Sequence, residues 1–372
     1  MSSDLPRICY LVTGLGFGGA ERELVQLASG LARCGWPVEV VSLLPAGGLA
    51  GELEAAGVPV TSLGMARGKP SVRALLRLAA HLREHPPALL HSFMVHANLM
   101  ARLVRLLAPV PALISTAQNT REGGRLRSWS IRLTDPLCDL TTQVSRAGFE
   151  RYRNQGLARP ENLLLVPNSV DLDRLRALPG TREQVRAELG AGARFVWLAV
   201  GRLEVQKDYP TLIQAVARLV EEGRDVVVWV AGQGPEAASL RAQAEVAGLG
   251  ERLLWLGLRP DVPRLLAAAD GFVMSSAWEG TPLALLEALA AGLPAVATAV
   301  GGCPEVLEMG ELVPAGDPAA LAAAMATLMA LPAAARRDRG EAGRASVAAR
   351  YGLAATLGRW EGIYRRLLSE RR

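Results

Sequence analysis

Residues 7–34 read RICYLVTGLGFGGAERELVQLASGLARC and contain a complete strand-to-helix unit. The run Ile8–Val12 is short and wholly apolar, which is typical of a buried strand. Four glycines follow between residues 13 and 19, and Ala20–Cys34 then places apolar side chains at helical spacing. The stretch therefore predicts a buried strand, a tight glycine-rich turn and a helix.

The same alternation of apolar runs and helical patterns continues along the chain. Expected strands in the first half are residues 8–12, 38–44, 58–63, 88–92 and 112–116, and in the second half 195–200, 225–231, 253–256, 271–275 and 295–299. Strands that alternate with helices indicate right-handed βαβ units and a parallel sheet. We therefore expect an α/β protein with two doubly wound, Rossmann-like domains.

The boundary between the two series follows the turn signal Pro167-Asn168-Ser169, after which residues 171–194 are polar. We expect a first domain at 1–172, a second at 173–352 and a terminal helix within 353–372. Two such domains predict a cleft between them, with ligands beyond the carboxyl ends of the strands. The terminal helix could close the second domain or reach back across the first.

Composition and charge argue against several classes of protein. The chain has 372 residues, 50% of them hydrophobic, and a net charge of +5, which is low for a dedicated nucleic-acid binder. Residues 1–172 carry 18 basic and 13 acidic side chains, so the excess charge lies in the first half. The four cysteines form no CxxC motif, and no signal peptide or clean membrane span is recognisable. These features predict a cytoplasmic protein without a disulfide framework.

The glycine-rich turn allows more than one interpretation. Gly14, Gly16 and Gly19 match G-x-G-x-x-G, which raises the possibility of an NAD(P)-dependent oxidoreductase. That fingerprint requires a carboxylate about 20 residues further on, at the end of the second strand. Here the strand ends in residues 42–45, Ser-Leu-Leu-Pro, which weakens the dinucleotide interpretation. A phosphate-binding turn and a plain structural turn remain as alternatives.

The loop after the first strand of the second domain carries two cations, Arg202 and Lys207. Lys207 stands out because Lys69 is the only other lysine in a chain that otherwise uses arginine. An ammonium group is a compact point charge, and two cations at the carboxyl end of a strand could neutralise a departing diphosphate. A solvated loop is the alternative.

Residues 279–287 read EGTPLALLE and place two carboxylates around a helix start. Pro282 suits the first helical position, so Glu279 would precede the helix and Glu287 would lie within it. The N–H groups of Thr281 and Leu283 would face an anion. Glu287 lies in an apolar stretch and therefore needs a partner, which a ribose diol or an arginine could supply.

These motifs together resemble those of retaining glycosyltransferases of family 4, which have the GT-B fold. The resemblance spans nearly the whole chain, in order and spacing, and rests on Gly14–Gly19, Val166-Pro167-Asn168, Gly201-Arg202 with Lys207, Gly232-Gln233-Gly234, Leu256–Asp261 and the pair Glu279 and Glu287. It implies a nucleotide-sugar donor, here expected to be UDP-linked, in the second domain. It also implies a glycan or lipid-linked acceptor in the first domain, no metal or other cofactor, and a terminal helix that crosses back to the first domain.

The resemblance also implies individual roles. Arg202 and Lys207 would hold the diphosphate, Glu279 the sugar hydroxyls and Glu287 the ribose. Other donor contacts would come from Gly18, Gly19, Leu258, Arg259, Thr281, Pro282 and Leu283. The implied reaction is a front-face transfer with retention, in which the leaving oxygen helps to deprotonate the acceptor.

One departure from the family concerns the position after the fifth strand, where relatives often have a histidine and this chain has Gln118. Glutamine can donate a hydrogen bond but cannot shuttle a proton. Activity could therefore be altered, and a non-catalytic nucleotide-sugar-binding relative is an alternative. We take His96 as the candidate catalytic histidine, although a core or capping role is open. Gln118, Asn119 and Arg121 are the acceptor-side candidates.

Residues 121–132 read REGGRLRSWSIR and mix cations with Trp129 and apolar side chains. Together with the excess charge of the first half, this pattern suggests a surface for anionic lipid headgroups or a lipid-phosphate acceptor. The expected location is then peripheral, at the inner face of the membrane. A solvated helix is the alternative.

Overall fold

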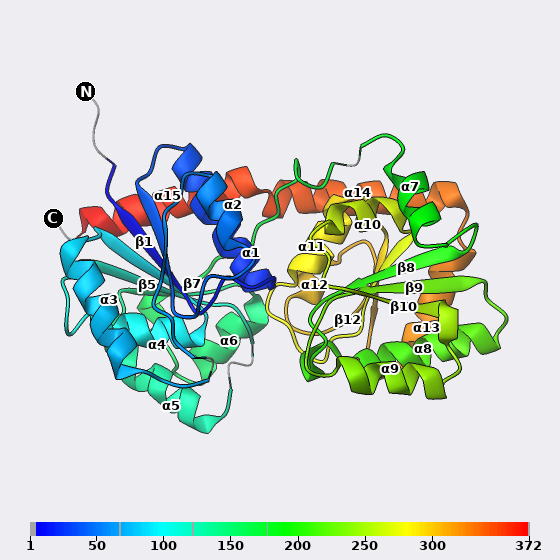
Figure 1. The fold of residues 1–372 in the computed structure, drawn as a ribbon, viewed down its shortest axis with the longest axis horizontal. Helices are drawn as coiled ribbons and strands as arrows, with labels where there is room; N and C mark the ends of the chain where they lie inside the picture. Colours follow the sequence, from blue (N-terminus) through cyan, green and yellow to red (C-terminus); the bar gives the residue numbers. More distant parts are fainter. Residues whose placement is uncertain (1–4, 67, 121–122, 177, 371–372) are drawn as a thin grey trace. The chain divides into compact units, whose positions relative to one another are not determined.

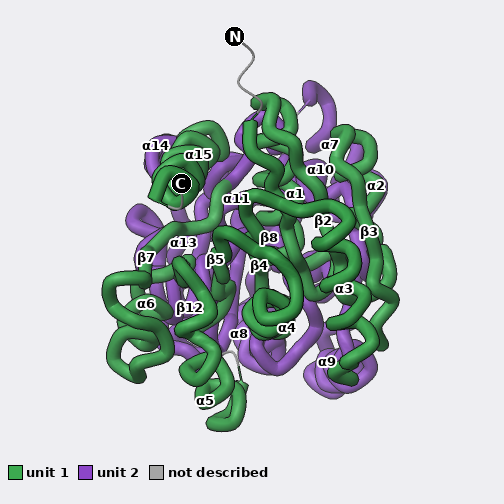
Figure 2. Tube along the Cα trace, turned by 90° about the vertical axis from the view of Figure 1, so that its left-hand side faces the viewer, with its two compact units in different colours: residues 1–169, 353–372 green, residues 170–352 purple. Residues whose placement is uncertain are grey.

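The computed structural model describes residues 5–66, 68–120, 123–176 and 178–370. The chain forms two compact units: unit 1 contains residues 1–169 and 353–372, and unit 2 contains residues 170–352 (Figures 1 and 2). Each unit is a parallel sheet with helices on both faces. The expected α/β fold with two doubly wound domains is confirmed.

Unit 1 is built on a parallel sheet in the order β3-β2-β1-β4-β5-β6-β7. Its strands are β1 (Ile8–Val12), β2 (Val38–Ser42), β3 (Val60–Ser62), β4 (Leu89–Phe93), β5 (Ala112–Ala117), β6 (Leu140–Gln143) and β7 (Leu163–Leu165). The strand order reverses between β1 and β4, and the carboxyl ends of these central strands lie at one edge of the sheet. Loops that follow them are therefore the ones expected to hold ligands.

Alternate residues of β1 face opposite layers of helices. Tyr10 belongs to the core beneath α1 (Gly19–Arg33), α2 (Ala50–Ala55) and α15 (Leu353–Ser369), whereas Leu11 packs beneath α3 (Val72–Glu84) and α4 (Val95–Val104). The second layer is completed by α5 (Arg125–Thr134) and α6 (Arg146–Asn154), with short 3-10 turns at Asp135–Leu137 and Pro160–Asn162. Period-two alternation thus divides the apolar side chains of each buried strand between two cores.

The C-terminal helix α15 is anchored to unit 1 by buried polar contacts. The hydroxyl of Tyr364 lies 2.8 Å from that of Tyr10 and 2.7 Å from Nδ1 of His91. The other ring nitrogen of His91 lies 2.7 Å from Oγ1 of Thr116. Burial lowers the pKa of His91 well below its ordinary value, so the ring is neutral at physiological pH. His91 is a core residue that joins α15 to the sheet.

Unit 2 is built on a second parallel sheet, in the order β10-β9-β8-β11-β12-β13. Its strands are β8 (Phe195–Val200), β9 (Val226–Ala231), β10 (Leu253–Gly257), β11 (Gly271–Met274), β12 (Ala295–Thr298) and β13 (Glu311–Val313). The order reverses between β8 and β11, so the crevice residues are expected in the loops that follow these two strands.

The helices of unit 2 also form two layers. One core includes side chains from α7 (Thr181–Glu188), α10 (Val262–Ala268), α11 (Leu283–Ala290), α12 (Cys303–Val306) and α14 (Ala333–Tyr351). The opposite core includes α8 (Tyr209–Glu221), α9 (Ala237–Val246) and α13 (Pro318–Ala330), and the 3-10 turns are Val205–Lys207 and Gly250–Arg252. Where the chain is described, no single helix is long and apolar enough to cross a bilayer; α13 and α14 reach that length only as a pair broken by a 113° bend.

Three local expectations differ from the structure. The polar stretch 171–194 contains α7, which buries only Thr181 and Val185 and therefore has a weak apolar signal. The region between residues 117 and 163, where the only element considered was a solvated helix in 121–132, forms α5, β6 and α6. Pro282 is the N-cap of α11 and Leu283 its first residue, because the backbone of Pro282 is extended, with φ −77° and ψ 101°.

Candidate functional site

The central feature of unit 2 is an ion pair between Lys207 and Glu279. Lys207 ends the 3-10 turn that follows β8, and Glu279 lies between β11 and α11. Their Nζ and Oε1 atoms are 2.5 Å apart. Glu279 is buried and Lys207 is mostly enclosed. The structure thus brings together two predicted site residues that are 72 positions apart in the sequence.

Hydrogen bonds hold the two loops together around this pair. The hydroxyl of Ser276 donates to Oε1 of Glu279 at 2.7 Å, and Nε2 of Gln206 donates to Oε2 at 3.3 Å. The hydroxyl of Ser275 donates to the carbonyl of Lys207 at 2.9 Å. These three polar side chains were not predicted as site residues, because nothing in their sequence spacing indicates which loops meet.

Glycines bring the loops after β8 and β9 into contact. A Cβ at position 232 would lie 1.8 Å from the carbonyl oxygen of Gly201, and one at position 234 would lie 2.2 Å from that of Leu203. The amide of Leu203 donates to the carbonyl of Gln233 at 3.0 Å. Only glycine permits so close an approach of two backbones. Gly232 and Gly234 therefore determine where the loop that carries Arg202 and Lys207 lies.

Replacing Gly232 with alanine is expected to displace that loop. The added methyl group overlaps a backbone oxygen that has no side-chain freedom, so we expect a loss of about 1–3 kcal/mol or more in stability. Thermal unfolding measures this loss. Gly358→Ala in α15 is the matched control, because a Cβ there meets open space. A Gly232→Ala variant with wild-type stability would contradict this account.

The start of α11 follows Glu279 directly. Thr281, Pro282 and Leu283 are all buried, and no side chain among the described residues caps the helix with a hydrogen bond. Uncapped backbone N–H groups at a helix N-terminus favour an anion. Cys303 lies near Glu279, and burial raises the pKa of its thiol to about 12, so it remains protonated and is a poor nucleophile.

The other predicted donor residues have partners within unit 2. The half-exposed side chain of Arg202 pairs with Glu204 at 3.2 Å, and Arg259 pairs with Asp261 at 2.7 Å. Glu287 lies 3.5 Å from Arg174, which is the arginine partner considered as an alternative to a ribose. Leu258 is exposed after β10. Arg202, Arg259 and Glu287 thus each pair with a residue outside the predicted set.

In unit 1, Gly18 is the N-cap of α1 and Gly19 its first residue. His96 lies in the first turn of α4, with its side chain exposed. Met94 immediately precedes α4 and has φ 71° and ψ 152°, a backbone conformation normally reserved for glycine. Partial desolvation, and secondarily the charge of Arg127, lower the pKa of His96. The imidazole is therefore neutral at physiological pH and could accept a hydrogen bond.

The acceptor-side candidates follow β5, which neighbours β4 in the sheet. Nε2 of Gln118 is buried and has no hydrogen-bond partner in the part of the chain that the structure describes. A buried amide without a partner is uncommon and can mark a position that a ligand would satisfy. Asn119 is half-buried, and Arg121 lies outside the described residues.

A buried carboxyl group in α1 was not predicted. Glu23 accepts hydrogen bonds from the backbone N–H of Ser169 at 2.8 Å and from its hydroxyl at 3.1 Å. Burial raises the pKa of Glu23 to about 8. A glutamate in the helical pattern of residues 20–34 reads as an ordinary surface charge, so the sequence carried no signal for this contact.

Two family models match the chain. "Glycosyl transferase 4-like domain" matches residues 18–169, and "Glycosyl transferases group 1" matches residues 181–346. Together they cover most of both units.

The chain is also similar to curated enzymes. It is 27% identical over 243 residues to the Escherichia coli UDP-Gal:alpha-D-GlcNAc-diphosphoundecaprenol alpha-1,3-galactosyltransferase, a match that covers 62% of each chain. It is 32% identical over 179 residues to the 2-deoxystreptamine glucosyltransferase of Streptomyces kanamyceticus, covering 47% of this chain and 45% of that one. These matches span less than two thirds of either relative.

The whole structure resembles that of Anabaena HepE in complex with UDP-glucose. The TM-score is 0.85 at 22% sequence identity, covering 98% of this chain and 100% of that chain. At this identity the likeness concerns the fold. With the two family models and the order of the motifs, it leads to one conclusion: the chain belongs to the family 4 glycosyltransferases and has the GT-B fold.

Proposed function

We propose that this protein transfers a sugar from a nucleotide diphosphate sugar, UDP-linked, to a glycan or lipid-linked acceptor, with retention of anomeric configuration. The observation that carries the proposal is the ion pair of Lys207 and Glu279 beside the uncapped start of α11. A cation next to a helix N-terminus suits a diphosphate, and a carboxylate beside it suits sugar hydroxyls. Membership of the glycosyltransferase family supports the same reaction class.

The proposed donor site uses residues of unit 2. Lys207 neutralises the diphosphate. Arg202 breaks its ion pair with Glu204 and also contacts the diphosphate. The N–H groups near Thr281 and Leu283 bind phosphate oxygens. Glu279 accepts hydrogen bonds from the sugar, and Glu287 accepts them from the ribose. Leu258 and Arg259 border the base, and Pro282 directs the helix start.

The proposed reaction is a front-face displacement. The bond between the anomeric carbon and the diphosphate oxygen breaks, and the acceptor oxygen bonds to the same face of that carbon. The acceptor proton passes to the departing phosphate oxygen. Charge stabilisation by Lys207 and Arg202 supplies most of the catalysis, so neither a metal ion nor another cofactor is required. Neutral His96 orients the acceptor, with Gln118 and Asn119 on the same edge of the sheet.

The test is a thermal-shift screen of UDP-, GDP- and ADP-sugars, followed by transfer assays with the donor that stabilises the protein. We expect UDP-sugars to give the largest shift and the product to keep the anomeric configuration of the donor, as read by NMR. Activity should persist in a metal chelator. Stabilisation without transfer or hydrolysis would indicate a non-catalytic relative, and no stabilisation by any nucleotide sugar would overturn the proposal.

A further inference from the structure

The outer surface of three helices in unit 1 carries most of the exposed large apolar side chains. Helices α3, α4 and α5 cover one face of the sheet, and α4 contacts both of the others (Figure 1). Within the described chain, eight of the fifteen exposed large hydrophobic residues lie on these helices or directly after α4: Val72, Leu76, Leu103, Leu106, Leu107, Leu126, Trp129 and Leu133. We call this surface the α3–α5 face.

Apolar residues on α5 form a helical stripe. Leu126, Trp129 and Leu133 are spaced three and four residues apart, and their exposed fractions are 83%, 63% and 61%. Only Ile131 of this helix is buried. Residues three and four apart share one side of a helix, so the stripe faces away from the core. An exposed apolar surface of this kind marks an interaction site.

The charged side chains on the same surface are almost all basic. Among the described residues, α3 and α5 expose six arginines, Arg73, Arg77, Arg83, Arg125, Arg127 and Arg132. The only acidic residue within α3, α4 and α5 is Glu84, at the end of α3. A second copy of this face would repel it, because a two-fold contact places like charges together. The occupant must therefore be anionic and also accept apolar side chains.

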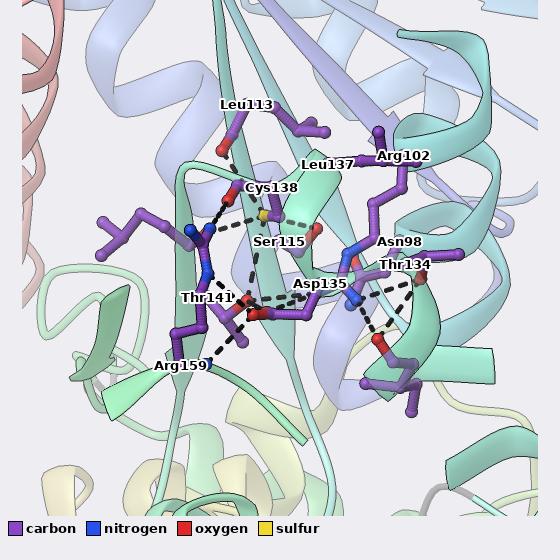
Figure 3. Close-up of polar contacts among 12 residues, drawn as sticks. Asn98, Arg102, Leu113, Ser115, Thr134, Asp135, Leu137, Cys138, Thr141 and Arg159 are labelled. Atoms are coloured by element: carbon purple, nitrogen blue, oxygen red, sulfur yellow. Dashed lines mark hydrogen bonds and ion pairs between the residues drawn. The ribbon is translucent and has the colours of Figure 1, made fainter. Parts of the chain in front are cut away.

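A buried network holds α5 in place (Figure 3). The guanidinium of Arg102 in α4 donates to the carbonyl of Ile131 at 2.9 Å and to the hydroxyl of Thr134 at 3.3 Å, both at the end of α5. It also donates to the hydroxyl of Thr141 in β6 at 3.0 Å and lies 3.9 Å from Asp135. Arg102 is fully buried. The exposed stripe is thus presented on a helix that is fixed to the core.

We propose that the α3–α5 face binds the surface of an anionic lipid bilayer. Trp129 and the leucines of α5 enter the region between headgroups and acyl chains, while the arginines contact lipid phosphates. Tryptophan favours this interface because its ring has an apolar body and a polar edge. Such docking needs no sugar donor and does not depend on the proposed reaction.

Vesicle flotation of the full-length protein tests the proposal without any substrate. Vesicles of phosphatidylcholine alone are compared with vesicles that also contain phosphatidylglycerol, over a series of salt concentrations. We expect binding to the anionic vesicles and its loss at high salt. Trp129→Ser with Leu133→Ser should lower the partition coefficient about tenfold or more, and each of Arg125→Ser and Arg132→Ser should lower it about fivefold.

Matched controls come from unit 2, where Leu178 and Val246 are exposed apolar residues outside this face. Leu178→Ser and Val246→Ser should leave flotation unchanged. Equal binding to neutral and anionic vesicles, or no effect of these α5 variants, would overturn the proposal. So would a concentration-dependent dimer, seen by light scattering, that the Trp129→Ser with Leu133→Ser variant abolishes.

Discussion

Replacing Lys207 with alanine is expected to lower turnover about 10²–10³-fold, the usual effect of removing one group that stabilises charge in the transition state. In the proposed reaction, negative charge develops on the diphosphate as its bond to the sugar breaks. The ammonium of Lys207, which is mostly enclosed and 2.5 Å from Glu279, would stabilise that charge. An ammonium group attracts a negative charge more strongly in such an enclosed position than in bulk water. Steady-state transfer rates with saturating donor measure the effect.

The control for this variant is Lys69→Ala, which changes the other lysine of the chain at an exposed position of unit 1. Removing Lys207 also leaves the buried carboxylate of Glu279 without its ion-pair partner, which costs stability. Thermal unfolding is therefore measured in parallel, and rates are compared where both proteins remain folded. Unchanged turnover in the folded Lys207→Ala variant would exclude Lys207 from the reaction.

Replacing Glu23 with glutamine is expected to remove a large pH dependence of stability. The pKa of Glu23 is raised from 4.5 to about 8 in the folded protein. Between these two values the folded state binds more protons than the unfolded state, so the free energy of unfolding falls as pH rises. A shift of this size corresponds to a change on the order of 5 kcal/mol across the window. Glutamine does not titrate and should flatten that slope.

Urea unfolding between about pH 5 and pH 8.5 measures the slope for both proteins. Glu54→Gln is the matched control, because Glu54 is an exposed glutamate in α2. It should leave the pH dependence of the wild type unchanged. Equal slopes for wild type and Glu23→Gln would show that Glu23 titrates near its ordinary pKa.

Much of the fold could be predicted, because most of the buried parallel strands are largely apolar runs, whereas β6 (Leu140–Gln143) reads LTTQ and was not expected. Ile8–Val12 and Phe195–Val200 were located to the residue by this signal. Helix α5 was considered only as an alternative, a solvated helix in residues 121–132, because only Ile131 of its ten residues is buried and it lacks an apolar stripe toward the core. The sequence shows that α5 contains apolar residues, but only the structure shows that they are exposed and form a surface.

The candidate site, too, could be predicted from the sequence only in part. Lys207 and Glu279 were identified from residue type and from their positions after strands, yet their direct contact could not be anticipated. Ion pairing depends on which strands are neighbours, and β8 lies next to β11 although β9 and β10 intervene in the chain. The same limit applies to Ser276, whose only sequence signal is its proximity to Glu279.

By itself, the order of residues determined the alternation of strands and helices, the two-domain class and the loops of the candidate site. These features depend on local periodicity and on glycine, proline and charge at short spacing. Tertiary structure alone decided three contacts: the burial of Glu23 against Ser169, the attachment of α15 through Tyr364 and the fit of Gly232 against Gly201. Each of these joins segments distant in sequence, and their energies depend on desolvation and close packing, which exist only after the chain has folded.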